Sequence, residues 1–372
     1  MYFNDVIGQD RLKRRLIVAA RRRIVPHAQL FSEKNGSGAF PLALAYARYL
    51  NCREPSDDDS CGRCPSCLKY DELAHPDLHF VFPIVKKGRK TVCDDYLPQW
   101  RELLKRNAYF SLEQWLGCME TGNSQAQIYA EESKQVLGKM NMRIYEAEYR
   151  VLLVWLPEKM NETCANKLLK IIEEPPPQTV ILMVSEDPLM LLETIRSRVQ
   201  PVNVNPVDNG SMVDALVRRE CLEREAAVDV ARLAGGSYIK ALETISLNEE
   251  NAFFLEHFKE MMRNSWARNI KAMKTSADHM ASLDREQQKR FLTYCQYLVR
   301  ENFVHRFQAP ELNYMSRREA EFAIRFAPFV NERNVFDLMG ELSKAELHTT
   351  RNVNAKMVFF DLSLRITALL RR

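Results

Sequence analysis

The sequence predicts an α/β domain of the P-loop type, followed by a small helical domain and an all-helical region. Three observations carry this prediction. Apolar runs alternate with helical patterns over the first 205 residues, a glycine loop follows the first apolar run, and strand-like alternation is missing after residue 247. Strands that alternate with helices favour a parallel sheet with helices packed on its faces.

Four short apolar runs are expected to form the strands, at residues 29–32, 78–83, 151–156 and 180–185. Helical patterns lie between them, at residues 10–23, 41–50, 130–144 and 161–172. The last of these helices should stop before Pro175, because proline cannot continue the helical hydrogen-bond ladder. Residues 206–246 are also helical, with a break at Gly235 and Gly236. We therefore expect three domains, at residues 1–205, 206–246 and 247–372.

The composition is that of an ordinary globular protein. The chain has 372 residues, of which 46% are apolar and 27% charged, enough for two or three hydrophobic cores. A net charge of +4 is too small to identify a nucleic-acid-binding protein. No stretch approaches the roughly 18 apolar residues that span a bilayer, and the N-terminus has no apolar signal core. We expect a cytoplasmic protein with no membrane partner.

Four of the nine cysteines have the spacing of metal ligands, C-x8-C-x2-C-x2-C, and these are Cys52, Cys61, Cys64 and Cys67. Four thiolates form a closed tetrahedral zinc site of the structural kind, with no open position for water. Unliganded free thiols are the alternative. His75 and His79 follow closely, but four sulfurs already complete the shell, so we interpret both as non-ligands. Isolated cysteines in a cytosolic protein are expected to be small buried hydrophobic residues rather than disulfides, and these are Cys93, Cys118, Cys164, Cys221 and Cys295.

The loop after the first apolar run occupies the place of a P-loop but lacks its working residues. In the pattern G-x-x-x-x-G-K-[ST], the lysine reaches the β- and γ-phosphates and the hydroxyl holds magnesium. Here Gly36 and Gly38 remain, but Ala39 stands at the lysine position and Phe40 at the hydroxyl position. Glu33 replaces the first glycine, and its carboxylate would repel a polyphosphate. We expect ATP not to bind tightly; a fold unrelated to P-loop proteins is the alternative.

The third apolar run lacks the acidic pair that would order magnesium and activate water. It ends in Trp155 and Leu156 instead. Neither side chain can bind a metal or accept a proton. Two independent catalytic elements are therefore missing together.

Several motifs resemble those of the AAA+ subunits of bacterial DNA polymerase III clamp loaders. Residues 27–31, H-A-Q-L-F, are similar to the family's H-A-Y-L-F, and residues 158–176 are similar to its M-x-x-x-A-A-N-A-L-L-K-x-L-E-E-P-P signature. Residues 3–9 resemble its opening F-x-x-I-I-G-Q, and residues 354–366 resemble its last collar helix. The resemblance implies a degenerate AAA+ domain with a zinc knuckle, a helical lid and a helical oligomerisation collar.

Within this family the chain resembles the delta-prime, or stator, subunits, which tolerate the loss of the nucleotide machinery. The nucleotide-sensing arginine of the motor subunits is matched by Ile239, a third missing contact. Arg198 keeps the arginine of the family's S-R-C motif, although Val199 replaces the cysteine. The resemblance implies that Arg198 is an arginine finger that acts in trans, on ATP held by a neighbouring subunit. A surface arginine is the alternative, and Arg196 lies off the motif position and is interpreted as structural.

The resemblance also implies the partners. They are motor subunits of the gamma/tau type, the delta subunit, the sliding clamp, and primer-template DNA through the assembled complex. The isolated chain would then be no enzyme, but a component of the DNA polymerase III holoenzyme. An active motor ATPase of the same assembly and a standalone zinc-dependent DNA-binding protein are the alternatives. The basic run at residues 86–90 could contact DNA phosphate, but we favour a solvated hairpin tip.

Overall fold

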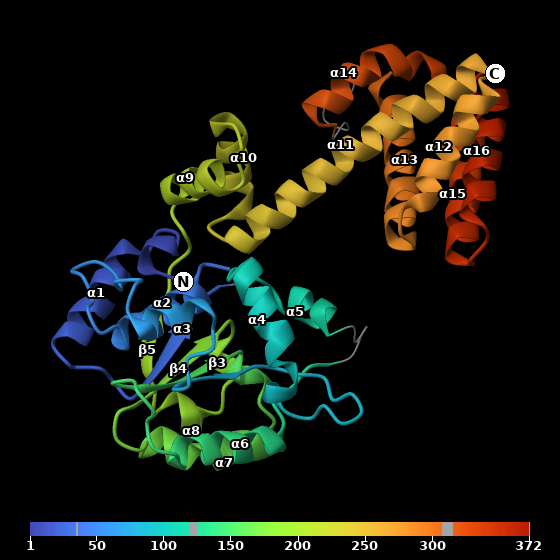
Figure 1. Cartoon of the computed structure of the whole chain (residues 1–372). Coiled ribbons are helices and arrows are strands. Elements are labelled where there is room, and N and C mark those ends of the chain that lie inside the picture. The colour runs from blue at the N-terminus through green and yellow to red at the C-terminus, as the bar shows by residue number, and fades with distance from the viewer. Residues whose placement is uncertain (35, 120–124, 307–314, 372) are drawn as a thin grey trace. The chain divides into compact units, whose positions relative to one another are not determined.

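A computed structural model of the chain describes residues 1–34, 36–119, 125–306 and 315–371 (Figure 1). The chain forms two compact units, Met1–Thr244 and Ile245–Arg372. Helix α11 (Tyr238–Ala267) runs without a break through the border between them, and through residue 246, where the sequence predicts a domain boundary. The division into three domains stays a prediction.

A five-stranded parallel sheet forms the centre of the first unit, with the strand order β2-β3-β4-β1-β5. The strands are β1 (Ala28–Ser32), β2 (Leu78–Val81), β3 (Arg150–Trp155), β4 (Thr179–Ser185) and β5 (Gln200–Asn203). The predicted α/β fold class is confirmed, and the four predicted strands are present. The sequence did not predict β5, because an exposed edge strand that contains Pro201 lacks a continuous apolar run.

Helices cover both faces of this sheet (Figure 1). One side carries α6 (Ala130–Asn141), α7 (Glu162–Glu173) and α8 (Glu193–Arg196), and the other carries α1 (Asp10–Arg21), α2 (Ala39–Leu50), α3 (Pro65–Asp71) and α4 (Leu97–Arg106). A further short helix, α5 (Leu112–Cys118), follows α4 in the chain. Strands β3 and β4 are buried along their whole length. Burial on both faces explains why these strands are continuously apolar rather than alternating.

Local sequence signals set where the helices begin and end. The Asn161 side chain accepts a hydrogen bond from the N–H of Cys164 and so begins α7. This helix ends at Glu173, before Pro175, as predicted. Two helices, α9 (Asn209–Arg219) and α10 (Arg224–Ala234), follow β5, and α10 ends at Gly235 in the left-handed conformation, φ +59°.

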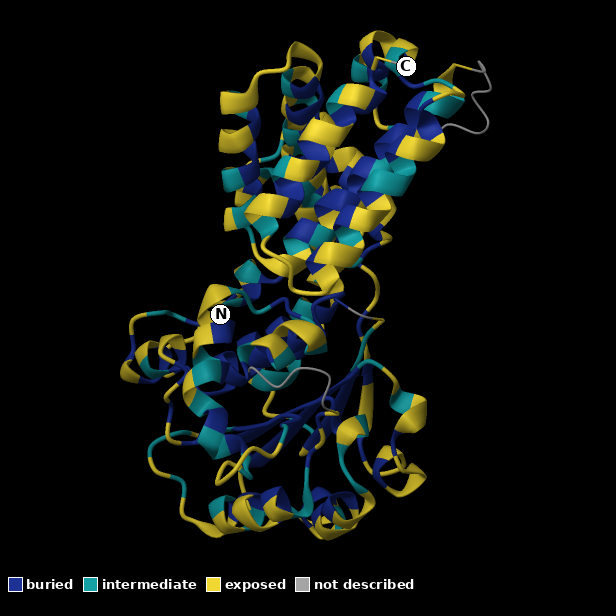
Figure 2. Cartoon of the chain, turned by 90° about the vertical axis from the view of Figure 1, so that its right-hand side faces the viewer, coloured by how far each residue is buried: buried dark blue, intermediate teal, exposed yellow. Residues whose placement is uncertain are grey.

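The described part of the second unit is helical. After α11 it contains α12 (Ile270–Ser282), α13 (Arg285–His305), α14 (Arg317–Phe326), α15 (Val335–Thr350) and α16 (Ala355–Leu369). Their buried faces turn toward one another and form a separate hydrophobic core, while their exposed faces turn outward (Figure 2). Among the described helices of the chain, none has both the length and the apolar character that crossing a bilayer requires.

Candidate functional site

The loop between β1 and α2 holds a carboxylate of its own chain. The Oε2 atom of Glu33 accepts a hydrogen bond of 3.0 Å from the backbone N–H of Ala39. Burial raises the pKa of Glu33, although the N–H groups of Ala39, Gly38 and Ser37 oppose this effect by hydrogen-bonding the charged form. N–H groups at the start of a helix are the groups with which a P-loop binds phosphate. Glu33 therefore occupies N–H groups of the kind that bind phosphate in a P-loop.

Two further carboxylates lie near Glu33, after the carboxyl ends of β3 and β4. Glu158 accepts hydrogen bonds from the backbone N–H groups of Glu186, at 3.0 Å, and Asp187, at 3.3 Å. Burial, together with the charges of Glu33 and Glu158, raises the pKa of Glu186 to about 7. Sequence reasoning missed Glu186, although a carboxylate directly after a predicted strand of a parallel sheet was an available signal. The three carboxylates make the region unfavourable for a polyphosphate.

Aromatic rings fill the space behind the loop. The ring of Phe40 lies 5.3 Å from that of Phe110, 5.7 Å from that of Trp100 and 6.5 Å from that of Trp155, measured between centroids. Trp155, at the end of β3, lies 4.8 Å from Phe110. Leu156 is buried beside β4 and donates its N–H to the carbonyl of Val184. The positions expected to supply a hydroxyl and a carboxylate for magnesium are thus hydrophobic and offer no side-chain oxygen.

The start of α11 packs directly on the loop. The N–H of Tyr238 donates a hydrogen bond of 3.0 Å to the carbonyl of Gly36. Gly36 has φ +80°, and a Cβ atom there would lie 2.6 Å from the hydroxyl oxygen of Ser237 and 3.0 Å from Ile239. Only glycine fits this close approach. Ile239 therefore takes part in a direct contact between the loop and the start of α11.

The four predicted zinc ligands are brought together. The sulfur atoms of Cys52, Cys61, Cys64 and Cys67 all lie within 4.8 Å of one another, and these four residues form the one candidate metal-binding group of the described residues. Sulfurs about 2.3 Å from a tetrahedral zinc ion would be about 3.8 Å apart, so a small contraction would complete the site. Each of the first three sulfurs accepts an N–H from the next ligand along the chain, at 3.2 to 3.4 Å. The donor set and its arrangement fit a structural zinc ion.

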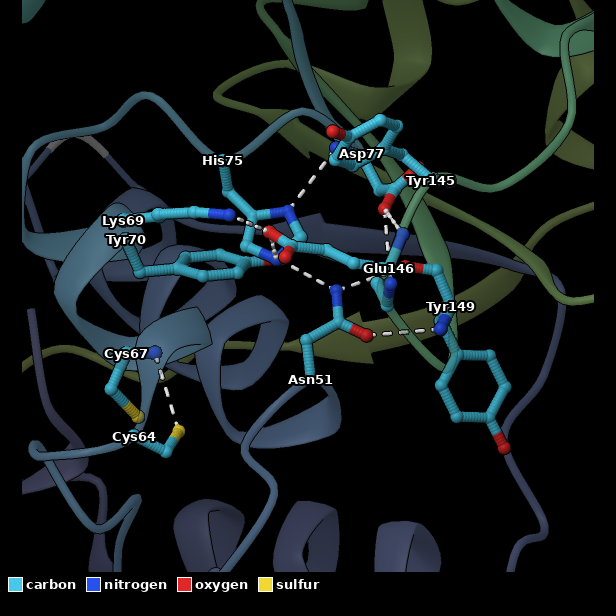
Figure 3. Close-up of polar contacts among 11 residues, drawn as sticks. Asn51, Cys64, Cys67, Lys69, Tyr70, His75, Asp77, Tyr145, Glu146 and Tyr149 are labelled. Carbon is cyan, nitrogen blue, oxygen red and sulfur yellow. Dashed lines mark hydrogen bonds and ion pairs between the residues drawn. The ribbon is translucent and has the colours of Figure 1, made fainter.

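A polar network connects this cluster to the sheet through α3 (Figure 3). Helix α3 carries Cys67 and Tyr70, and the Tyr70 hydroxyl accepts a hydrogen bond of 2.8 Å from the side chain of Asn51. The Asn51 side chain also donates a hydrogen bond to the backbone carbonyl of Tyr149 and accepts one from its N–H, both at 2.9 Å. Tyr149 lies directly before β3. The ring of His75 packs against Tyr70, 4.9 Å between centroids. These contacts fasten the four-cysteine segment to the α/β core.

Neither histidine belongs to the cysteine cluster. The Nδ1 atom of His75 accepts the N–H of Asp77 at 3.1 Å, and burial lowers the pKa of this histidine. Burial, with the charges of Lys139 and Arg150, lowers the pKa of His79 to about 4. Both side chains are therefore neutral parts of the packed interior near neutral pH.

Arg198 lies on the surface directly after α8. Its Nε atom pairs with Glu173, and its Nη1 atom donates to the carbonyl of Thr194 at 2.8 Å and to the hydroxyl of Ser197 at 3.3 Å. The side chain is 39% exposed. Arg196 is also exposed, at the last residue of α8. The structure thus presents Arg198 to solvent in an oriented form.

The basic run at residues 86–90 is exposed, and Lys87 and Lys90 form a backbone bridge as residues at a hairpin tip do.

The isolated cysteines differ in burial. Cys93, Cys164 and Cys295 are buried, and Cys118 is half-buried. The prediction of burial is wrong for Cys221, which is exposed because it stands in the short turn between α9 and α10, with φ +54°.

Comparison with known proteins decides the family. A family model described as "DNA polymerase III, delta subunit" matches residues 8–208, more than half of the chain. The DNA polymerase III delta-prime subunit of Escherichia coli is 27% identical over 213 residues. The chain belongs to the DNA polymerase III delta-prime family.

Relatives of this delta-prime family member match to different extents. The E. coli alignment covers 57% of this chain and 52% of that protein, so the chain spans about half the length of that relative. The delta-prime subunit of Haemophilus influenzae is 22% identical over 340 residues, covering 90% of this chain and 88% of that one. The gamma/tau subunit of Mycobacterium tuberculosis is 28% identical over 241 residues, covering 63% of this chain and 35% of that one.

Proposed function

We propose that this delta-prime family member is an ATP-independent stator of a bacterial DNA polymerase III clamp loader in DNA replication. A stator is a rigid subunit against which motor subunits move to open and place the sliding clamp. The observation that carries the proposal is the contact of the Glu33 carboxylate with the N–H of Ala39. When a chain's own carboxylate occupies the N–H groups that would bind phosphate, we expect ATP to cause no conformational change.

Two further features support the loss of ATP chemistry. Phe40 and Trp155, at positions expected to supply oxygen ligands for magnesium, are buried aromatic side chains that pack together. The hydrogen bond from the N–H of Tyr238 to the carbonyl of Gly36 joins the loop directly to the start of α11. The isolated chain is accordingly proposed to be no enzyme, but a component of the holoenzyme.

Arg198 is proposed to serve a neighbouring subunit in trans. It is exposed and oriented by Glu173 and Thr194, as a group that reaches into another subunit's site needs to be. A fixed guanidinium charge near the γ-phosphate stabilises the charge that develops there during hydrolysis. A subunit that hydrolyses no ATP can therefore still complete the site of the next one.

The four-cysteine cluster is proposed to hold a structural zinc ion. A closed site of four thiolates leaves no coordination position for a substrate or water. The ion would fasten the segment between α2 and α3 on the sheet. We assign it no part in the chemistry of ATP.

The proposed partners are motor subunits of the gamma/tau type, the delta subunit, the sliding clamp, and primer-template DNA through the complex. The similarity to delta-prime and gamma/tau subunits of DNA polymerase III supports this assembly. The helical second unit is the proposed oligomerisation collar, after a degenerate AAA+ domain and a small helical lid.

The similarity to the M. tuberculosis gamma/tau subunit favours a second candidate, an active motor ATPase. Calorimetry of the purified chain with magnesium and ATP separates the two. The stator proposal predicts no binding in the micromolar range. Micromolar, magnesium-dependent binding would contradict it and favour the motor ATPase.

A further inference from the structure

We propose that a groove between α11 and α14, in the helical second unit, binds a short acidic peptide segment that carries an aromatic side chain. The groove has a volume of about 560 Å³. Ligand sites in proteins commonly have volumes of about 300–1,000 Å³. The proposed function gives the second unit a role in oligomerisation and assigns no ligand to this groove, so the two proposals are independent.

One face of each helix forms a wall of the groove (Figure 1). On α11 the lining side chains run from Glu256 to Trp266, and on the other wall they run from Arg318 on α14 to Phe329. Phe329 belongs to the short 3-10 turn Ala327–Phe329 that follows α14. The lining residues recur every three or four positions, the spacing of side chains that share one side of a helix.

Aromatic rings form the floor of the groove. Phe258, which is fully buried on α11, packs against Phe322 and Phe326 of α14, at 6.0 and 5.4 Å between ring centroids. Trp266 packs edge-on against Phe329 at 4.8 Å, and 43% of Trp266 is still exposed. The hydrophobic core therefore supports the floor from behind, while the floor presents aromatic surface to solvent. Tryptophan and arginine are among the residues that contribute most to binding at protein interfaces.

Cations line the rim. Three arginines are exposed there, and none of them forms an ion pair with another described residue; they are Arg263, Arg318 and Arg325. Lys259 is the fourth cation, and it pairs with Glu256 at 2.8 Å and lies 5.5 Å from the ring centroid of Phe322. A guanidinium group can bind a carboxylate through two parallel hydrogen bonds. The rim therefore offers three guanidinium groups to the carboxylates of a ligand.

The lining favours a peptide over a nucleic acid. Glu256 and Glu321 also line the groove, and their carboxylates repel a strand that carries a negative charge at every phosphate. A peptide carries fewer charges and can place its carboxylates beside the arginines alone. Its aromatic side chain would pack against the rings of the floor, as aromatic pairs do in protein cores and interfaces.

Trp266 provides a spectroscopic signal from inside the groove. Of the four tryptophans, Trp100, Trp115 and Trp155 are buried and only Trp266 is exposed. A ligand that covers Trp266 should shift its fluorescence to shorter wavelength and protect it from quenching by acrylamide. The probes are synthetic peptides without tryptophan, in which the number and the position of glutamates around one phenylalanine vary.

We expect members of this peptide set to shift the Trp266 emission, and to bind more weakly at high salt because the paired charges are exposed. Peptides with glutamine in place of each glutamate, or with alanine in place of the phenylalanine, should cause no shift. Arg263→Gln and Arg325→Gln change exposed side chains, so the fold should be kept, and each should weaken binding of the best peptide about tenfold. Arg351→Gln is the matched control and should bind as wild type, because Arg351 is exposed directly after α15 and outside the groove.

Three results would overturn the proposal. The first is an unchanged Trp266 emission with every peptide of the set at up to about 1 mM, where even a weak complex forms. The second is equal affinity of wild type, Arg263→Gln and Arg325→Gln for the best peptide. The third is tighter binding of a single-stranded oligonucleotide than of any peptide, which would assign the groove to nucleic acid.

Discussion

The carboxylate of Glu33 lies 3.0 Å from the backbone N–H of Ala39, at the start of the helix that would bind a phosphate in a P-loop ATPase. The sequence suggests that Glu33 repels phosphate. In the structure the Glu33 carboxylate takes the place that a phosphate has in a P-loop, so the N–H groups are hydrogen-bonded to the chain's own side chain. This hydrogen bond stabilises the conformation of the loop and does not depend on ATP.

Replacing Glu33 by alanine should create a phosphate-dependent protein. The variant leaves the N–H groups of Ser37, Gly38 and Ala39 without this acceptor, and inorganic phosphate can then bind them. At ten times its dissociation constant, phosphate would stabilise the variant by about 1.4 kcal/mol. Thermal unfolding with and without phosphate measures this. Glu72→Ala, which removes an exposed carboxylate elsewhere, should gain no such dependence. Equal responses of the two variants would count against the finding.

The raised pKa of Glu186 predicts a pH dependence of stability. Its pKa is about 7 in the folded chain and near 4.5 ordinarily, so the folded chain binds more protons there between these values. Stability should therefore fall as the pH rises from about 4.5 to 7. Glu186→Gln should exceed wild type at pH 8 by on the order of 1–2 kcal/mol, after allowance for solvent screening. Near pH 4.5 the two should be alike.

Urea unfolding at both pH values measures this difference. Glu193→Gln, an exposed carboxylate on α8, is the control and should follow wild type at each pH. A constant offset between Glu186→Gln and wild type across the range would disprove the assignment of the titration to Glu186.

Restoring P-loop residues alone should damage the fold without creating an ATPase. Ala39→Lys places a cation at a fully buried position, and Phe40→Thr removes a ring from the cluster with Trp100, Phe110 and Trp155. Large-to-small changes of buried aromatics typically cost about 3–5 kcal/mol. Denaturation and ATPase assays of the double variant should show lower stability and no turnover. ATP turnover above background would mean that Trp155 and Leu156 are not the obstacle.

Features that depend on local pattern could be predicted from the sequence. The runs that became β3 and β4 are continuously apolar, and the four cysteine ligands lie within 16 residues, so short spacing alone brings them together. The end of α7 before Pro175 follows from proline's missing N–H.

Features that depend on distant contacts could not be predicted. Trp100 and Phe110 reach Phe40 only through the folded arrangement of α4 and its following loop. The docking of Glu33 on Ala39 depends on the turn that the loop takes, which the residue types do not specify. Arg48 interrupts the apolar pattern of α2, and its partner Asp71 belongs to a different helix, α3.

Removing zinc should loosen the knuckle and leave the sheet folded. We expect about one zinc per purified chain, the content of a single tetrahedral site. Chelation should increase hydrogen exchange in residues 52–71, while β3 and β4, in a core of their own, stay protected. Elemental analysis and exchange mass spectrometry test the two parts. A zinc-free preparation would remove the metal assignment, and cooperative unfolding of the sheet on chelation would show that the knuckle is no separate addition.

The exposed, oriented Arg198 predicts an effect on a neighbouring subunit. Arg198→Ala should leave folding, zinc content and assembly unchanged, because the side chain lies on the surface. An arginine finger contributes roughly 10³–10⁵ to turnover at one site. Only one of several sites would be damaged, so total ATP hydrolysis by the complex should fall partially and clamp loading more strongly. Arg196→Ala, an exposed arginine two residues away, is the matched control.

We propose that this chain binds no ATP and acts on the ATP of its neighbour. The most direct measurement is DNA- and clamp-stimulated ATP hydrolysis and clamp loading by the reconstituted complex, with wild-type, Arg198→Ala or Arg196→Ala chains. We expect Arg198→Ala to lower both rates and Arg196→Ala to match wild type. Wild-type rates with Arg198→Ala, in a complex that assembles normally, would contradict it.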